Sequence, residues 1–476
     1  MSTQSIPAVG PAPAAVASTR SRWLPLPVIL AGTFMVVLDF FIVNVALPSM
    51  QAHLHASSSA IEWVVAGYGL TNAVFLITGA RLGDRWGRVR VFTIGLALFT
   101  LASAGCGLAE TPEVLVISRL AQGCASALLM PVVLSIIGVL YEGADRARAL
   151  AAYGMSMGFA AVSGQLIGGI LVQVNPAGLG WRSCFLINLP IGVLAVAAAP
   201  RVIPESRGAS GSLDLTGTVL ATLGLSAIVL PLVEGRAHAW PLWTWLSLAI
   251  APFLLGTFAR QQHRLARRGG AALMPPELFR SRGFTVGLAA QLLFWCGQAS
   301  FFLVLSLYLQ LGRGMSALHS GLVFTILAAA YLATSLRAPV LTVRHGRSVL
   351  AAGAAMLAVG HVTLALTVAG IGVGGSVLVL APGLALVGAG MGLGITPLAT
   401  LIMTTAPPQH MGATSGVLAT MQNVGNALGV SLIGVLFYGA VSQGFAGAFQ
   451  ISVIALAVTL TAVAALTRLI PATVAS

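Results

Sequence analysis

Apolar stretches of 18 or more residues recur along almost the whole chain, and they constrain its fold more than any other feature. A helix of about 20 apolar residues spans the ~30 Å hydrocarbon core of a bilayer. Only 7% of the 476 residues are charged and the mean hydropathy is +0.96, whereas roughly 25% of the residues in a soluble domain are charged. The sequence therefore predicts an all-α integral membrane protein in contact with the lipid bilayer.

The apolar stretches divide into fourteen predicted membrane-spanning helices, separated by more polar segments. The first eight are predicted at 26–49, 61–80, 91–109, 112–135, 148–172, 182–200, 214–233 and 240–259. The other six are predicted at 284–309, 317–338, 348–369, 375–403, 411–438 and 446–469. An even number of crossings places both ends of the chain on the same side of the membrane.

The positions of the basic residues predict which side that is. All 24 are arginine, and twenty of them lie in segments that these helices place on one side of the membrane. Three lie on the other side (Arg182, Arg236, Arg313) and Arg119 lies inside a predicted helix. Cytoplasmic segments are enriched in basic residues, so we predict a bacterial cytoplasmic (inner) membrane protein with both termini in the cytoplasm. This placement accounts for the net charge of +13 without a nucleic-acid partner.

A charged, glycine-containing loop follows the second predicted helix and reads ARLGDRWGRVR over residues 80–90. Glycine permits tight turns and close helix approach, and Asp84 can pair with Arg88 or cap a neighbouring helix. A two-sided transporter needs such contacts on its faces, because they form and break with little net change in free energy. We therefore predict a gating segment composed of Arg81, Gly83, Asp84, Arg85, Gly87 and Arg88.

The gating segment resembles the signature between helices 2 and 3 of the major facilitator superfamily, with Ala80 in place of its usual first glycine. Further segments resemble the fourteen-helix drug:proton antiporters of that superfamily: LDFFIVNVALP at 38–48, RLAQG at 119–123, WRSCFLINLPIG at 181–192, and MGATSG continuing to NALG over 411–429. After the tenth predicted helix, PVLTVRHGR at 339–347 echoes the gating segment, although Val343 stands at its aspartate position.

The resemblance implies the major facilitator superfamily fold, in which two six-helix bundles rock against each other to give alternating access. It places the N-terminal bundle at 26–200, two inserted helices at 201–260, a cytoplasmic linker at 261–283 and the C-terminal bundle at 284–470. Residues 1–25 and 471–476 are then cytoplasmic tails, and we expect the first to be disordered. We also expect the protein to act as a monomer.

Asp39 is the one carboxylate, and Arg119 the one arginine, that lies well inside a predicted apolar helix. A charge at mid-bilayer costs at least ~2.5–3.5 kcal/mol and normally faces a cavity and has a partner. The two residues lie at similar depth, so they would share one cavity if the first and fourth helices meet. One hypothesis is that Asp39 exchanges protons and that its separation from Arg119 couples protonation to conformation. The alternative is a permanent ion pair that holds the two helices together.

Polar and small residues in other helices are candidates for the transport pathway. Amides and an indole would offer uncharged hydrogen bonds and an aromatic wall to a substrate, or would bond neighbouring helices; they are Asn44, Gln122, Gln291, Trp295, Gln298, Gln422 and Asn426. The fifth predicted helix carries glycines that permit either sliding contacts or rigid packing, namely Gly154, Gly158, Gly164, Gly168 and Gly169. Gln165 stands where the antiporters normally have proline.

Together these features predict proton-coupled efflux of small hydrophobic or monovalent cationic drugs or antibiotics, because one carboxylate can neutralise one positive charge. Export of an endogenous secondary metabolite is the alternative, and a membrane enzyme or sensor is a third hypothesis. The sequence contains no nucleotide-binding loop, catalytic cluster or metal-ligand pattern. We therefore expect a non-enzymatic transporter driven by the proton motive force, with neither cofactor nor metal.

Overall fold

The computed structural model describes residues 23–207, 214–270, 272–274, 276–405 and 411–469. Most of the predicted N-terminal tail and all of the predicted C-terminal tail lie outside these residues. The described chain consists of helices and connecting segments, without a strand. Among the described residues, thirteen helices are long and apolar enough to cross a membrane, and one bent helix pair, counted as a single span, brings the number to fourteen. The predicted all-α multi-pass membrane fold is confirmed.

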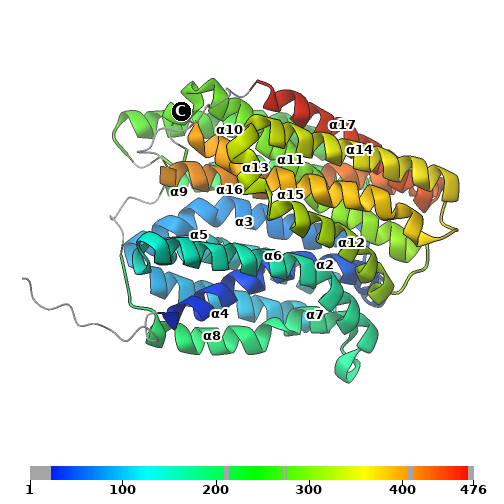
Figure 1. Ribbon diagram of the computed structural model, residues 1–476, viewed down its shortest axis with the longest axis horizontal. Coiled ribbons are helices and arrows are strands. Elements are labelled where there is room, and N and C mark those ends of the chain that lie inside the picture. Colours follow the sequence, from blue (N-terminus) through cyan, green and yellow to red (C-terminus); the bar gives the residue numbers. More distant parts are fainter. Residues whose placement is uncertain (1–22, 208–213, 271, 275, 406–410, 470–476) are drawn as a thin grey trace, which may run out of the picture.

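Six spans form the N-terminal half, drawn from blue to green in the lower part of Figure 1. α5 packs between α3 and α4, α6 packs against α2, and α8 packs against both α4 and α2. The sixth span is broken into two helices, α7 and α8. In order, the helices are α2 (Pro25–Leu54), α3 (Ser58–Trp86), α4 (Arg88–Gly107), α5 (Pro112–Leu140), α6 (Gly143–Val174), α7 (Ser183–Leu186) and α8 (Asn188–Val202).

The C-terminal half, drawn from green to red in the upper part of Figure 1, repeats this organisation. α14 packs against α15 and α17, α11 against α16, and α12 against α15. Its helices are α11 (Arg282–Leu307), α12 (Ala317–Ser335), the short α13 (Ala338–His345), α14 (Arg347–Ile371), α15 (Ala381–Thr404), α16 (Met411–Ala440) and α17 (Phe445–Thr467). Two six-span bundles are the fold class predicted from the sequence, and it is confirmed.

Two inserted helices, α9 (Leu215–Glu234) and α10 (Leu242–Arg267), pack against each other. α9 also contacts α3 of the first half and α16 of the second. α10 leaves most of its apolar side chains exposed, as for Phe253 at 74%, because the surrounding medium in the membrane is lipid.

α10 continues beyond its predicted end at residue 259 into the segment predicted as a linker. Asp214 explains the extension. Its carboxylate accepts a hydrogen bond from the backbone nitrogen of Gly217 at 2.8 Å, which caps the start of α9. The side-chain amides of Gln261 and Gln262 donate to the same carboxylate at 2.8 and 2.5 Å. These bonds hold the end of α10 against the start of α9 and stabilise its last turns.

The gating segment is helical, in contrast to the loop expected from the sequence. α3 bends by 48° and continues to Trp86. Gly83 permits close packing, because a Cβ atom there would lie 2.8 Å from Val132 of α5. Gly87 then ends the helix with a φ of +107°, a conformation that favours glycine. In the C-terminal half, α13 follows α12 at the place where the sequence echoes this segment.

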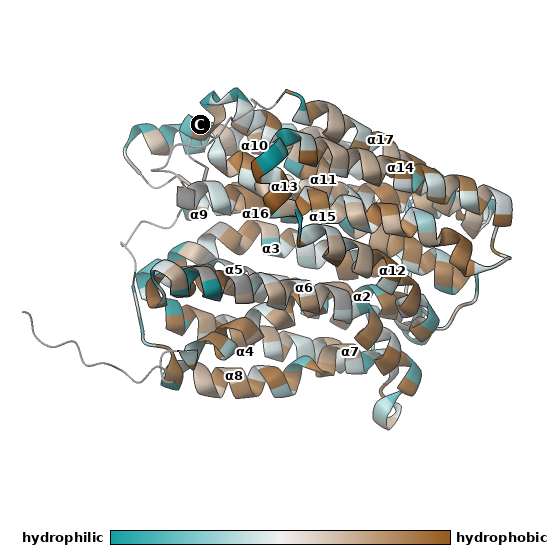
Figure 2. Cartoon of the chain, viewed as in Figure 1, coloured by the Kyte–Doolittle hydropathy of each residue, from teal (hydrophilic) through white to brown (hydrophobic). Residues whose placement is uncertain are grey.

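The two halves are closed against each other at one end. Hydrophilic residues gather at helix ends and connecting segments, and the helix middles are apolar (Figure 2). At the end opposite the predicted arginine-rich side, Ser306 of α11 donates to the carbonyl oxygen of Asn44 at 2.6 Å. Gln310 donates to the carbonyl oxygen of Val45 at 2.9 Å. We call this the outer end, and the opposite one the arginine-rich end.

Candidate functional site

A cavity of about 960 Å³ lies between the two halves. Helices α2, α3, α5 and α6 line it from one half, and α11, α12, α15 and α16 from the other. Contacts between the halves close it at the outer end. At the arginine-rich end its mouth is lined by Arg81, Asp84, Arg88, Arg146, Ala272 and Leu273. Its volume lies in the range that holds a small organic molecule.

Four of the seven predicted cavity residues line this cavity: Trp295, Gln298, Gln422 and Asn426. Gln165 also lines it, and within the described structure neither polar atom of its amide has a hydrogen-bond partner. Other lining groups had no distinguishing signal in the sequence, including Tyr68, Asn72 and Tyr331. The wall therefore combines aromatic rings with uncharged amides.

The other three predicted cavity residues lie outside the lining, and the prediction is corrected for them. The side-chain amide of Asn44 donates to a carbonyl oxygen one turn earlier in its own helix at 3.0 Å. Gln291 donates to the carbonyl oxygen of Leu418 at 3.5 Å. Gln122 donates to Asp39 at 2.8 Å. Each amide bonds other parts of the protein, so the alternative of internal hydrogen bonding holds for all three.

Asp39 of α2 and Arg119 of α5 form a fully buried ion pair inside the N-terminal half. Nη1 of Arg119 donates to Oδ2 of Asp39 at 2.5 Å. The other carboxylate oxygen accepts from Gln122 at 2.8 Å and from Asn188 of α8 at 3.2 Å. Nε of Arg119 donates to the carbonyl oxygen of Val64 at 2.9 Å. Three donors around the carboxylate thus offset much of the loss of hydration.

Tyr68 of α3 contacts this ion pair and also borders the cavity. Its ring lies 4.3 Å from the guanidinium carbon of Arg119 and also lines the cavity. Asp39 and Arg119 are 0% and 1% exposed and do not line the cavity themselves. The first and fourth spans meet as expected, but at an interface within one half. The expectation that both charges share the cavity is corrected accordingly.

The charged residues of the gating segment form local contacts at the mouth. Nη2 of Arg88 lies 2.9 Å from the Asp84 carboxylate, one turn earlier in the chain. Arg81 donates to the carbonyl oxygen of Ala272 at 2.6 Å, which connects α3 with the segment after α10. Arg85 is exposed. The pairing of Asp84 with Arg88 is one of the two arrangements expected, and the gating role of the segment stays a prediction.

Glu205, which the sequence did not single out, caps the start of α4. Its carboxylate oxygens accept from the backbone nitrogens of Val89 at 2.9 Å and Arg90 at 3.0 Å. A carboxylate is favourable at a helix N-terminus. A Cβ atom at Gly87 would lie 2.7 Å from this carboxyl group, so glycine leaves room for the cap. Glu205 lies in the polar segment after α8, and nothing in the sequence around it indicates that it contacts the start of α4.

The predicted glycines of α6 form two groups. Gly164 and Gly168 pack against α2, where an added Cβ atom would lie 2.9 and 2.8 Å from the nearest side chains. Gly169 packs against α12, with a Cβ position 2.8 Å from a backbone carbonyl oxygen. Gly154 and Gly158 line the cavity, and nothing lies within 4 Å of their Cβ positions. Close helix packing therefore requires glycine in the outer part of α6.

A second charged cluster, also missed from the sequence, lies at the outer end. Glu62 of α3 is fully buried beside Gly434 of α16. Arg236, between α9 and α10, lies 3.4 Å from the Glu62 carboxylate and stacks over the Tyr438 ring of α16. The cluster joins both halves to the inserted helices. Glu62 lies at the start of an apolar stretch, where a polar residue is expected to face water. The structure shows instead that α16 covers its side chain.

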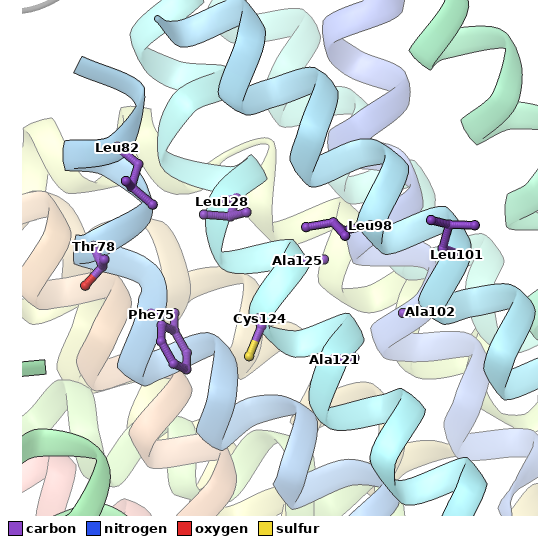
Figure 3. A pocket seen from close by; sticks show the side chains of 10 residues that line it. All are labelled: Phe75, Thr78, Leu82, Leu98, Leu101, Ala102, Ala121, Cys124, Ala125 and Leu128. Carbon is purple, nitrogen blue, oxygen red and sulfur yellow. The ribbon is translucent and has the colours of Figure 1, made fainter. Parts of the chain in front are cut away.

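The remaining described residues provide weaker candidates for binding. A pocket of about 540 Å³ lies between α3, α4 and α5, lined by residues such as Phe75, Leu101 and Cys124 (Figure 3). Leu101 is 67% exposed, so the pocket opens on the lipid-facing surface. Its ten lining residues include no charged or amide side chain to orient a polar ligand. Among the described residues, no three His, Cys, Asp or Glu side chains are arranged to hold a metal ion.

Comparison with known proteins decides the family of the chain. The model of the Major Facilitator Superfamily matches residues 29–430. The chain belongs to the major facilitator superfamily. It is therefore a multi-pass membrane transporter, which agrees with its helices and with the cavity between its halves.

Relatives within the superfamily include bacterial proteins that are named for transport, export or resistance. The chain is 39% identical to the "Probable actinorhodin transporter" of Streptomyces coelicolor, covering 91% of this chain and 74% of the relative. It is 34% identical to the "Cephamycin export protein CmcT" of Amycolatopsis lactamdurans, covering 92% of this chain and 90% of the relative. The "Multidrug resistance protein Stp" of Mycobacterium tuberculosis is 32% identical, and the match covers 87% of this chain and 76% of the relative.

Solved structures of other transporters share the fold. A POT family transporter in complex with 5-aminolevulinic acid matches with a TM-score of 0.68 and 17% identity, covering 92% of this chain and 94% of that one. An inward-facing bacterial homologue of the lysosomal transporter Spinster matches with a TM-score of 0.66 and 17% identity, covering 95% and 97%. At these identities the likeness concerns the fold alone.

Proposed function

We propose that this transporter exports small organic molecules, either drugs or secondary metabolites, in exchange for protons. The observation that carries the proposal is the cavity between the halves, together with the fully buried carboxylate of Asp39 in the N-terminal half. A cavity that is open at one end and closed at the other is one of the two states that alternating access requires. Relatives named as export proteins support the direction of transport.

The outer contacts are suited to repeated opening. Ser306 and Gln310 bond backbone carbonyl oxygens of α2, and Gly169 packs closely on α12. Small residues allow helices to approach and separate without rearranging large side chains. Rocking of the halves would break these contacts and form others at the arginine-rich end, where the gating segment lies. The same cavity would then open at the outer end.

Asp39 is the proposed site of proton exchange. Loss of water disfavours its charge, whereas Arg119, Gln122 and Asn188 favour it by donating hydrogen bonds. Asp39 lies on α2 and its donors lie on α5 and α8, so a shift between these helices changes the number of donors. Uptake or release of a proton would then be linked to the conformation of the N-terminal half.

The distribution of arginines supports placement in the bacterial cytoplasmic membrane, with both termini and the open end of the cavity in the cytoplasm. Exchange with protons would draw energy from the proton motive force, without a cofactor. We propose that the monomer is the transporting unit, because the cavity, the ion pair and the outer contacts form within one chain.

A metabolite made by the cell itself is the second candidate substrate. The relative at 39% identity is named a probable actinorhodin transporter and another is named for cephamycin export, whereas a third is named for multidrug resistance. Deleting the gene in its own host distinguishes the two. If the substrate is made by the cell, its concentration should fall in the medium and rise in the cells after deletion. If the protein exports drugs, deletion should change only the tolerance of the cells to added compounds.

Everted membrane vesicles test proton-coupled export directly, because export appears in them as uptake. An imposed pH gradient, acidic inside, should drive uptake of a transported compound, and adding that compound should release protons from the lumen. A toxic-compound panel on cells with and without the protein selects the compound. If no compound from the panel shows proton-linked uptake, the antiport proposal is wrong.

Asp39→Asn tests the proton site in the same vesicles. We expect loss of proton-driven uptake, with substrate exchange in the absence of a gradient retained. Glu110→Gln is the matched control, because Glu110 is an exposed carboxylate between α4 and α5. Comparison of the protein amounts in the membrane separates loss of coupling from loss of folding. Undiminished proton-driven uptake in Asp39→Asn would contradict the assignment.

A further inference from the structure

The charges that line the cavity are predominantly positive. Among the described residues, its mouth is lined by three arginines, Arg81, Arg88 and Arg146, and by one carboxylate, Asp84. Asp84 is already paired with Arg88 at 2.9 Å. Arg146 is exposed, and its guanidinium lies near Gly138 at the end of α5. A cleft lined by one sign of charge attracts ions of the opposite sign and raises their local concentration.

No carboxylate lines the deeper part of the cavity within the described residues. Asp39 is 0% exposed, is bonded by three donors and does not line the cavity. Glu62 is buried in the cluster with Arg236 at the outer end. The sequence-based expectation of a monovalent cationic substrate rested on Asp39 facing the cavity. The structure leaves a substrate cation with no free carboxylate to neutralise it.

The deeper lining suits a planar aromatic molecule that carries polar substituents. Tyr68, Trp295 and Tyr331 present rings to the cavity. Gln165 is 3% exposed and its amide has no hydrogen-bond partner among the described residues, so it has two donors and an acceptor available. An unpaired buried amide is costly, and a bound oxygen-bearing ligand would satisfy it. Gln298 adds a second amide from the other half.

We propose that the substrate is an aromatic organic anion, such as a phenolate or carboxylate, that enters past the arginines of the mouth and lies between the rings and amides of the cavity. This inference rests on the proposed export function and specifies its substrate class. The membrane potential also favours export of an anion. When an anion leaves the cell as protons enter, each cycle moves one more charge down an inside-negative potential than export of a neutral molecule does.

Three planar dyes in everted vesicles test the charge preference: resorufin, an anion; its O-methyl ether, which is neutral; and ethidium, a cation. We expect the highest kcat/KM for resorufin and the lowest for ethidium. Preference for ethidium, or equal transport of resorufin and its ether, would overturn the anion proposal and leave the export function standing. If none of the three dyes enters vesicles that take up the compound selected from the panel, the anion proposal is overturned and the export function stands.

Arg146→Gln tests the contribution of the mouth. We expect the KM for resorufin to rise roughly threefold to tenfold, the size of one partly screened charge interaction, with a smaller change for the ether. Arg148→Gln is the matched control, because Arg148 is an exposed arginine on the same helix that pairs with Asp145 and does not line the cavity. Equal effects of the two substitutions on resorufin would contradict attraction by the mouth.

A potassium gradient with valinomycin tests the charge moved in each cycle, using vesicles without the protein to subtract passive dye movement. A lumen-positive potential, with no pH gradient, should stimulate uptake of resorufin more than uptake of its ether. This readout does not depend on dye affinity, so it separates an anion carried as such from a dye that binds in its protonated form. Equal stimulation of the two dyes would overturn the proposal.

Discussion

The ring of Tyr68 lies 4.3 Å from the guanidinium carbon of Arg119, and the same residue lines the cavity. The buried ion pair is therefore adjacent to the transport pathway without being part of its surface. Asp39 is 0% exposed in this state, in which the outer end is closed. If Asp39 is the proton site, as proposed, we expect it to exchange protons only when the helices around it shift.

Replacement of Tyr68 by alanine should open this wall. We expect water to reach Asp39 and protons to leak through the transporter without substrate. Loss of the cation–π contact should also lower stability by about 0.5–2 kcal/mol. Tyr68→Phe keeps the ring and should behave like the unmodified protein. Proton flux into vesicles without substrate measures the leak, and equal flux through the alanine and phenylalanine variants would contradict the role of the ring.

Single neutralisation of Asp39 or Arg119 should be more damaging to folding than removal of both charges. A buried ion pair with one partner removed leaves an uncompensated charge, at a cost of about 3–5 kcal/mol. We expect Asp39→Asn and Arg119→Gln each to shorten the lifetime of the detergent-solubilised protein, and the double variant to recover part of it. Proton coupling should be absent in all three. Additive losses of stability would show that the two charges are not coupled.

Gly87→Ala should destabilise the arginine-rich end. The residue has a φ of +107°, and the new Cβ atom would lie 2.7 Å from the Glu205 carboxyl that caps α4. Strain of this kind costs about 1–3 kcal/mol. Gly154→Ala is the control, because its Cβ position meets nothing within 4 Å and its helical backbone suits alanine. Thermal denaturation of the purified variants gives the comparison, and an unchanged midpoint for Gly87→Ala would argue against the strained turn.

A larger residue at Gly169 should shift the transporter away from the state seen here. A Cβ atom at that position would lie 2.8 Å from a carbonyl oxygen of α12, so Gly169→Val should hold the outer end apart. Gly158→Val, placed where a Cβ atom meets nothing within 4 Å, is the matched change. Accessibility of a cysteine at Gln298, which lines the cavity, reports the state. A membrane-impermeant maleimide should label it faster from the outer side in Gly169→Val than in Gly158→Val.

Pairings between residues close in the chain could be predicted, whereas those between distant helices could not. Asp84 and Arg88 lie four residues apart across a single turn, so their pairing follows from local geometry. The burial of Glu62 depends on Gly434 of α16, which lies 372 residues (434 − 62) further along the chain. Hydropathy around Glu62 describes its own helix and carries no information about which helix will cover it.

The sequence by itself determined the crossings, the likeness of the two halves and the family, because apolar length, arginine placement and motifs are local properties of the chain. Only the tertiary structure decided which polar groups face the substrate. Gln122 and Gln298 are both amides inside apolar helices, yet Gln122 bonds Asp39 and Gln298 lines the cavity. Helical periodicity shows which residues share a face, but packing among distant helices sets the rotation of each helix and hence what that face meets.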